Sequence, residues 1–238
     1  MSTRRVRAIL RKELRDFRRN GQTVWAMAIL PSIFLIQPLV VILTVAPSTA
    51  LEISHAPVLV YMLAIPALVP ATLAASAVVG ERQQATLEPV LTTPVRREEL
   101  MLGKALAVLL PSVAISYMVF AFFAACVAVF AIPAVAAALL RGSEVLAQLV
   151  FTPLIAGWSI WLGMAISTRV NDIRTAQQLG ILASLPSAAV TTVIAFKLVP
   201  ATLGVAVGLA AALLLLNGLG WRFVSAMFDR ERLIAGTR

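Results

Sequence analysis

The chain has 238 residues, of which 60% are hydrophobic and only 13% are charged. A soluble domain carries roughly 45–50% apolar and about 25% charged residues, so this composition excludes an ordinary water-soluble domain and indicates an integral membrane protein. The formal net charge is +9, but the Lys and Arg residues adjoin apolar runs, where they suit an anionic membrane surface. We therefore expect no nucleic-acid partner.

The first residues predict an amphipathic helix. Apolar residues recur at helical spacing, and basic residues cover the other faces. The apolar positions are Val6, Ile9, Leu10, Leu14 and Phe17. We expect this helix, within residues 1–22, to lie in the membrane interface with its apolar side in the acyl chains, either as a simple anchor or with a mechanical role. It is not a cleavable signal, because its basic segment is long and no small-residue cleavage site follows.

Residues 23–238 are predicted to form one bundle of six transmembrane helices. A bilayer core about 30 Å thick needs roughly 20 apolar residues in a helix. The six stretches that meet this requirement are 24–45, 58–79, 106–130, 145–167, 179–196 and 201–221. The last two are separated only by the segment from Lys197 to Pro200, so they are either two crossing helices or one helix followed by a re-entrant hairpin.

The distribution of basic residues predicts the orientation. With the N-terminus inside, eighteen of the 20 Lys and Arg residues lie on the cytoplasmic side, and only Arg141 and Lys197 lie outside. The positive-inside rule therefore places both termini and the loop after the second span in the cytoplasm. The expected location is the plasma (inner) membrane of a bacterium or archaeon.

The predicted spans contain several prolines, each of which removes a helix hydrogen bond and favours a kink where a neighbouring helix can satisfy the freed carbonyl. These prolines are Pro31, Pro38, Pro66, Pro70, Pro111, Pro153 and Pro186. In the last span Gly204 and Gly208 form a small-xxx-small pair that allows close helix approach, within this subunit or with another.

The spans lack the chemistry of pumps and enzymes. They contain no Asp, Glu, Lys, Arg or His, although ion-coupled carriers generally need ionisable groups at membrane depth. The single histidine, His55, is too little for a metal site, which usually needs three or four ligands. No G-x-x-x-x-G-K-[ST] loop is present to hold nucleotide phosphates. We therefore expect no catalytic residue, metal or cofactor in this chain.

The loop at 80–105 is the longest polar interruption, and its order predicts structure. A short helix is expected between Glu81 and Glu88, with a break at Pro89. Thr93 and Pro94 are predicted to start a second helix as N-cap and first helical residue. Glu98 and Glu99 favour that helix start through the helix dipole. The helix is expected to run into the third span.

This loop resembles that of the ABC-2 type permeases, the membrane subunits of ABC exporters. The residues that carry the resemblance are Glu81-Arg82, Thr86-Leu87-Glu88, Leu91, Thr93-Pro94-Val95-Arg96, Glu98/Glu99 and Leu102-Gly103-Lys104. The chain departs from the family pattern at Ala85, where glycine is usual, and at Pro89, where an apolar helix former is usual. The layout of a basic amphipathic helix followed by six spans also resembles the family.

The resemblance implies an all-α fold of the ABC-2 (type V exporter-like) kind, with a cytoplasmic coupling helix in the loop and a connecting helix at the N-terminus. It implies two copies of a separate ATP-binding cassette ATPase, which would hold the ATP and magnesium, and a second permease subunit, identical or different. The residues at which it places the ATPase contact are Glu81, Thr86, Leu87, Glu88, Thr92, Thr93, Pro94 and Arg96.

The uncharged, proline-rich spans suit a lipid-like, drug-like or other amphipathic cargo, moved outward by ATP hydrolysis on the partner. A haem or cytochrome-maturation type permease has a similar length and loop and is the alternative among transporters. A membrane assembly or sensor subunit that transports nothing, and a membrane-embedded hydrolase or transferase, are the alternatives from other classes.

Overall fold

The computed structural model describes residues 2–19, 21–44, 58–83, 96–195 and 202–227. These residues are almost entirely helical, and no strand occurs among them, in agreement with the all-α prediction. In chain order the helices are α1 (Thr3–Arg19), α2 (Gly21–Thr44), α4 (Val58–Ser76), α5 (Val79–Gln83), α7 (Arg97–Phe130), α8 (Pro133–Leu139), α9 (Gly142–Arg169), α10 (Ile173–Ala195) and α11 (Leu203–Met227).

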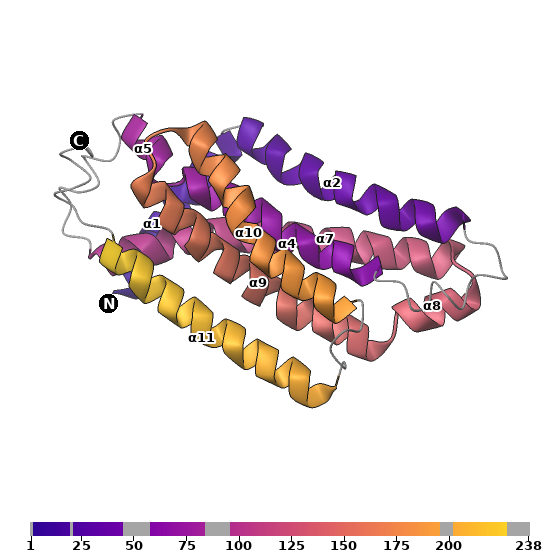
Figure 1. Cartoon of the computed structure of the whole chain (residues 1–238). Helices are drawn as coiled ribbons and strands as arrows, with labels where there is room; N and C mark the ends of the chain where they lie inside the picture. Colours follow the sequence, from indigo (N-terminus) through magenta and orange to yellow (C-terminus); the bar gives the residue numbers. More distant parts are fainter. Residues whose placement is uncertain (1, 20, 45–57, 84–95, 196–201, 228–238) are drawn as a thin grey trace.

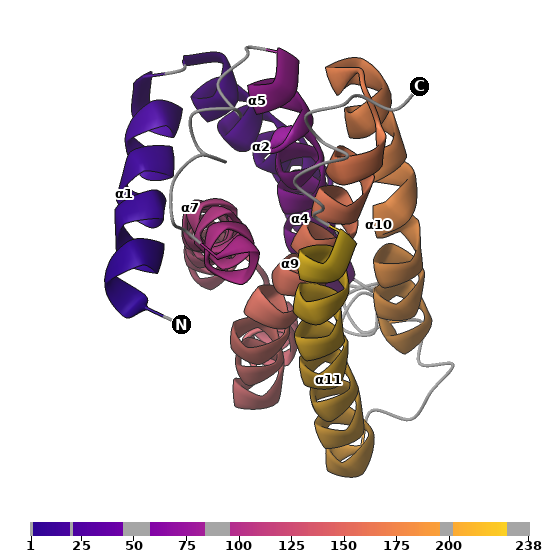
Figure 2. The same cartoon turned by 90° about the vertical axis from the view of Figure 1, so that its left-hand side faces the viewer.

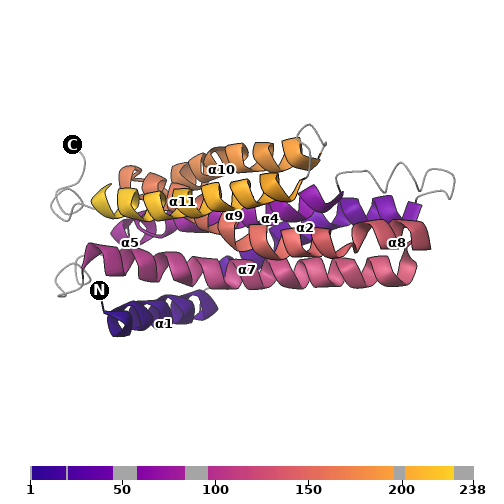
Figure 3. The ribbon, with the colours of Figure 1, turned by 90° about the horizontal axis from the view of Figure 1, so that it is seen from below.

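The long helices run side by side along one direction (Figure 1), while α1 lies outside them, across the first part of α7 (Figures 2 and 3). The helices α1 and α5 lie at one end of the bundle and α8 lies at the other. We call the end that holds α1 and α5 the basic end, because the arginines of α1 lie there.

Four described stretches are long and apolar enough to cross a bilayer: Met62–Glu81, Arg97–Phe130, Gly142–Arg169 and Leu203–Met227. A shorter apolar stretch, Pro31–Thr44, lies in α2. The helix α10 is not among the four, so the count of six spans stays a prediction. The structure does separate α10 from α11 as two long helices, but the segment from Lys197 to Pro200 lies outside the described residues.

The helix α4 lies at the centre of the bundle and packs against α2, α7, α9 and α10. Its Ala71, Ala74 and Ala75 are fully buried. A Cβ atom added to Gly163 of α9 would overlap the Ala71 carbonyl oxygen, and one added to Gly180 of α10 would lie 3.1 Å from the same oxygen. Small residues on both sides therefore let three helix backbones approach closely, as is typical of membrane helix interfaces.

The second predicted span, 58–79, overlaps the apolar stretch Met62–Glu81, but it is not one unbroken helix, because α4 ends at Ser76 and α5 begins at Val79. The Ser167 hydroxyl of α9 accepts hydrogen bonds from the amides of Val78 (2.9 Å) and Val79 (3.0 Å). Amides at a helix start have no partner within the helix. The serine supplies that partner and fixes the point at which the chain leaves α4.

The helix α7 begins earlier than its predicted span and has 34 residues. At 1.5 Å per residue it is about 51 Å long, well beyond a hydrocarbon core of about 30 Å, so its first turns extend past the apolar layer. Its N-cap is Arg96 and not Thr93, because the Glu99 side chain accepts the Arg96 amide at 3.3 Å. The continuous run from the acidic first turn into the span is confirmed.

Proline in α9 is tolerated for the expected reason. Pro153 has no N–H and cannot bond the Leu149 carbonyl four residues earlier. The hydroxyl of Tyr117, on α7, donates to that same carbonyl oxygen at 2.7 Å. A neighbouring helix thus satisfies the acceptor that the proline leaves free.

At the end opposite α1, the connection between α7 and α9 contains a short helix, α8, which the sequence did not predict. Pro133 occupies its first turn, a position where the missing N–H is harmless. Val135 and Leu139 are buried against Phe123 and Val127 of α7. The connection is therefore packed as part of a second apolar core.

Candidate functional site

The predicted ATPase-contacting residues fall on a loop of which only the two ends are described. Glu81 lies in α5, and Arg96 precedes α7. Thr86, Leu87, Glu88, Thr92, Thr93 and Pro94 lie outside the described residues. The contacts that hold each end of this loop lie within the described residues.

The apolar face of α1 packs on α7. Val6 is only 7% exposed, and Ile9 and Phe17 lie against the core formed by α4, α7, α9 and α11. A Cβ atom on Gly103 of α7 would lie 2.7 Å from Cγ2 of Ile9, which is too close for any other residue without a shift of the helices. The absence of a side chain at Gly103 brings the two helices into contact.

This packing corrects the expectation that the whole apolar face of α1 enters the acyl chains. Val6, Ile9 and Phe17 contact protein instead, because Gly103 offers α1 a closer fit than lipid does. Leu10 and Leu14 are half-buried and do not belong to this core. For them the interfacial role stays a prediction.

A buried cation lies next to this contact. The Lys104 side chain of α7 is 2% exposed, and its ammonium lies 2.8 Å from Oε1 of Glu81 and 3.1 Å from Oε1 of Glu13. It also donates to the Ala77 carbonyl oxygen at 3.3 Å. An unpaired buried charge is strongly destabilising, and here two carboxylates from α1 and α5 neutralise one ammonium from α7.

Lys12 of α1 extends the group, with its ammonium 3.1 Å from Oε1 of both Glu13 and Glu81. Burial would raise the pKa of Glu13, but the ammonium groups of Lys104 and Lys12 outweigh it and lower that pKa. Burial would lower the pKa of Lys12, but the carboxylates of Glu13 and Glu81 outweigh it and raise that pKa. We call these four residues, Lys12, Glu13, Glu81 and Lys104, the charge clasp.

A second polar contact joins the start of α1 to α7. The Glu99 side chain, 1% exposed, accepts the Ser2 amide at 2.6 Å and pairs with Arg5 at 3.4 Å. Because Glu99 also accepts the Arg96 amide, one carboxylate joins the beginning of α1 to the end of the loop. Acidic residues in a first helical turn also fit the helix dipole.

The other end of the loop is held by the turn between α9 and α10. Gln83 in α5 donates from Nε2 to the Asn171 carbonyl oxygen at 3.0 Å. The next residue, Asp172, caps α10 by accepting the Thr175 amide at 2.9 Å, and this bond lowers the pKa of Asp172. Both ends of the predicted coupling loop are therefore fixed to neighbouring helices.

The sequence did not lead us to predict a role for Lys12 and Glu13 at this site. The available signal was position, because Glu13 follows Ile9 by four residues and Val6 by seven and so lies on the apolar face of α1. An acidic residue on an otherwise apolar face predicts a buried cation opposite it. Lys104 was noted only as part of the Gly-Lys pair that resembles the family.

Comparison with known proteins identifies the family of the chain. No curated protein matches the chain. The family model described as "ABC-2 family transporter protein" matches residues 7–221, which include α1 from Arg7 onward, both ends of the loop and all the long helices up to Trp221 of α11. The chain belongs to the ABC-2 family of transporter proteins and is an ABC permease.

Proposed function

We propose that the chain is the transmembrane subunit of an ATP-driven exporter. Its six long helices, α2, α4, α7, α9, α10 and α11, would all cross the membrane, with the basic end in the cytoplasm. Two copies of an ATP-binding cassette ATPase would bind at that end, and a second permease subunit would complete the translocation path. Membership of the ABC-2 family and the positive-inside rule support this assignment.

The charge clasp is the observation that carries the proposal. Glu81 lies in α5, just before the segment 84–95, and Lys104 lies two turns into α7, which follows it. The ammonium of Lys104 is 2.8 Å from Glu81 and also pairs with Glu13 of α1. A force that an ATPase applied to the loop would reach α1, α5 and α7 together. Separating these helices would expose or unpair a buried ammonium, which costs several kcal/mol, so they move as one unit.

From the clasp, motion has two routes into the membrane. The helix α7 is continuous for 34 residues, so displacement of its first turns is carried along its length. The helix α5 is linked to the central helix α4 through a turn whose amides are held by Ser167. The loop therefore acts on the most deeply packed helix and on the longest one.

The membrane surface of the chain supports a proposal for the cargo class. The described parts of the long helices expose mainly large apolar side chains toward their surroundings. A lipid-like, drug-like or other amphipathic molecule can move along such a surface without the ion sites that a charged solute needs.

Association with an ATPase tests the proposal directly. We expect a P-loop ATPase, co-expressed with the tagged permease, to co-purify with it and to hydrolyse ATP faster in the complex. Replacing Leu87 and Glu88 with alanine should abolish both effects. The matched control is Glu144→Gln, which changes an exposed carboxylate in the first turn of α9. Unchanged association and unchanged hydrolysis in the Leu87/Glu88 variant would contradict the coupling role of the loop.

A further inference from the structure

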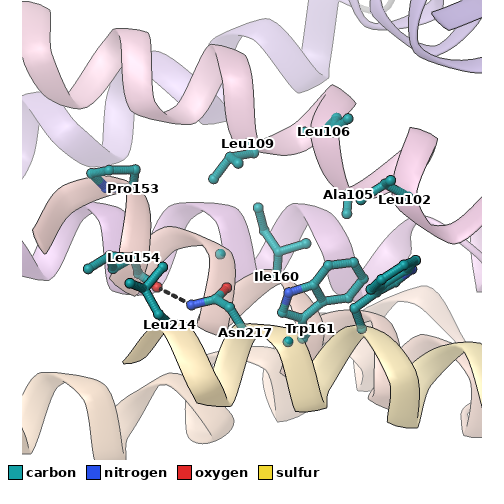
Figure 4. Close-up of a pocket in the computed structure, with 13 residues that line it drawn as sticks. Leu102, Ala105, Leu106, Leu109, Pro153, Leu154, Ile160, Trp161, Leu214 and Asn217 are labelled. Atoms are coloured by element: carbon teal, nitrogen blue, oxygen red, sulfur yellow. Dashed lines mark hydrogen bonds between the residues drawn. The ribbon is translucent and has the colours of Figure 1, made fainter. Parts of the chain in front are cut away.

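A cavity of about 290 Å³ lies between α7, α9 and α11 (Figure 4). Leu106 and Leu109 line it from α7, Ile160 and Trp161 from α9, and Leu214 and Gly218 from α11. This volume is at the low end of the range for small-molecule sites. We call this cavity the α11 groove.

The groove is mainly apolar, and the amide nitrogen of its one asparagine is bonded to backbone carbonyls. Asn217 donates from Nδ2 to the Leu154 carbonyl oxygen at 3.0 Å and to the Leu213 carbonyl oxygen at 2.8 Å (Figure 4). This leaves mainly the carbon surface of the leucines, Ile160 and the Trp161 ring along the walls. Such a lining attracts hydrocarbon and gives a polar solute no partners.

Glycine keeps the groove open. A Cβ atom built on Gly218 would meet no atom within 4 Å among the described residues, so the space beside it is free for another molecule. The wall from Leu102 to Leu109 on α7 corresponds to a rise of about 10 Å. The groove is therefore about as long as a segment of one hydrocarbon chain.

A cation and a free donor mark the end of the groove nearest the basic end. Arg222 is exposed and follows Gly218 by four residues, which places it on the same face of α11, one turn further on. Within the described part of the chain Arg222 has no ion-pair partner. Trp221 lines the groove, and its buried Nε1 has no hydrogen-bond partner there.

We propose that the α11 groove binds one acyl chain of an anionic phospholipid whose headgroup lies at Arg222. The neighbouring exposed side chains, including Leu110, Leu215 and Leu219, are those of a surface in hydrocarbon, so a lipid is the molecule at hand. The guanidinium supplies charge complementarity to the phosphate. The buried indole N–H of Trp221, which has no partner among the described residues, lines the same groove and can donate to a polar atom of the lipid that enters it. The site is independent of any ATPase.

Photolabelling tests this site. The purified chain is reconstituted in phosphatidylcholine nanodiscs with a trace of phosphatidylglycerol that carries a diazirine in its acyl chain, and the labelled peptides are identified by mass spectrometry. We expect adducts on the peptides that contain Leu106 and Leu214. In the Gly218→Leu variant, labelling should fall to the level of a phosphatidylcholine probe, because the new side chain fills the groove without meeting protein.

Two controls keep this test independent of folding. Gly208→Leu places the same side chain on the same helix at another position with no atom within 4 Å among the described residues, and its labelling should equal that of the unaltered chain. Arg222→Gln should reduce the preference for phosphatidylglycerol over phosphatidylcholine about fivefold, as expected for one basic residue near a membrane surface. Arg169→Gln, another exposed arginine, should leave that preference unchanged. Equal labelling by the two lipids, or full labelling of Gly218→Leu, would overturn the proposal.

Discussion

The helices α4 and α11 are similarly apolar, yet they have opposite surroundings. In the apolar stretch that begins in α4, 61% of the residues are buried, against 6% for α11. The difference lies in what the small residues face. The alanines Ala71, Ala74 and Ala75 of α4 meet glycines on its neighbours. In α11, Gly204 and Gly208 meet no atom within 4 Å among the described residues, and leucines such as Leu214 are exposed. In lipid, apolar character alone gives no force between helices, and close packing of small residues does.

The basic end and α11 also differ in their polar contacts. At the basic end, α1, α5 and α7 are joined by the four residues of the charge clasp. In the described part of α11, the polar contacts to another helix that we identify come from Asn217. A firmly held unit, formed by α4 and the clasp, therefore lies next to a loosely held α11. The predictions below break one side of this comparison or the other.

The largest effect is expected at the centre of α4. Replacing Gly163 with leucine would drive a side chain into the Ala71 carbonyl and the Ala74 methyl group. We expect the free energy of unfolding to fall by about 3 kcal/mol, seen as a lower midpoint in thermal unfolding in detergent. Gly208→Leu, made where no atom lies within 4 Å in the described structure, should melt like the unaltered chain. Equal melting of the two variants would contradict the close α4–α9 contact.

Breaking the charge clasp comes next. Lys104→Met removes the buried ammonium and leaves Glu13 and Glu81 paired with the half-exposed Lys12. Loss of one partner of a buried ion pair costs about 3 kcal/mol, and we expect somewhat less here because Lys12 remains. Adding Glu13→Gln should restore part of the stability in a double-mutant cycle. Strictly additive losses would show that the two residues do not interact.

A smaller effect is expected in α11. Asn217→Leu removes the hydrogen bond to the Leu154 carbonyl, which is worth about 1 kcal/mol between membrane helices. We expect faster amide hydrogen exchange in α11 and an unchanged rate in α4. Leu215→Ala, at a side chain that is 69% exposed, serves as the control and should change neither rate.

The smallest effect is a dependence on pH. The pKa of Glu13 is lowered from its ordinary 4.5, so its stabilising contribution is present above pH 4.5 and is lost as the pH falls through the lowered pKa. The pKa of Lys12 is raised above its ordinary 10.5, so its contribution is present below pH 10.5 and is lost as the pH rises through the raised pKa. The difference in unfolding midpoint between the unaltered chain and Glu13→Gln should be constant near neutral pH and shrink below pH 4.5. A constant difference down to pH 3 would contradict the assignment.

The helices themselves could be predicted because each is a long apolar or amphipathic run. The predicted ends of the six long helices lie within nine residues of the observed ones, with the largest difference at the start of α7. The break at Ala77 could not, because it depends on Ser167, nearly ninety positions away. The burial of α4 could not be separated from the exposure of α11, since both stretches are equally apolar and only the facing glycines distinguish them.

The candidate site was predictable in part for a similar reason. Glu81 and Lys104 belong to a local pattern that resembles the family loop, and they were found. Lys12 and Glu13 complete the same cluster from α1, and their role depends on how Gly103 lets α1 cross α7. Contacts made across the fold by single side chains leave little trace in the local sequence.

The central claim is that the charge clasp transmits motion from the loop to the membrane helices. The variant Glu13→Gln, Lys104→Met neutralises the buried Glu13–Lys104 pair while keeping its shape and leaves Glu81 unaltered, a change that folded proteins often tolerate. In a reconstituted complex we predict that the ATPase still co-purifies with this variant but that ATP hydrolysis is no longer stimulated, whereas Glu144→Gln retains both. Full stimulation by the neutralised variant would contradict the account.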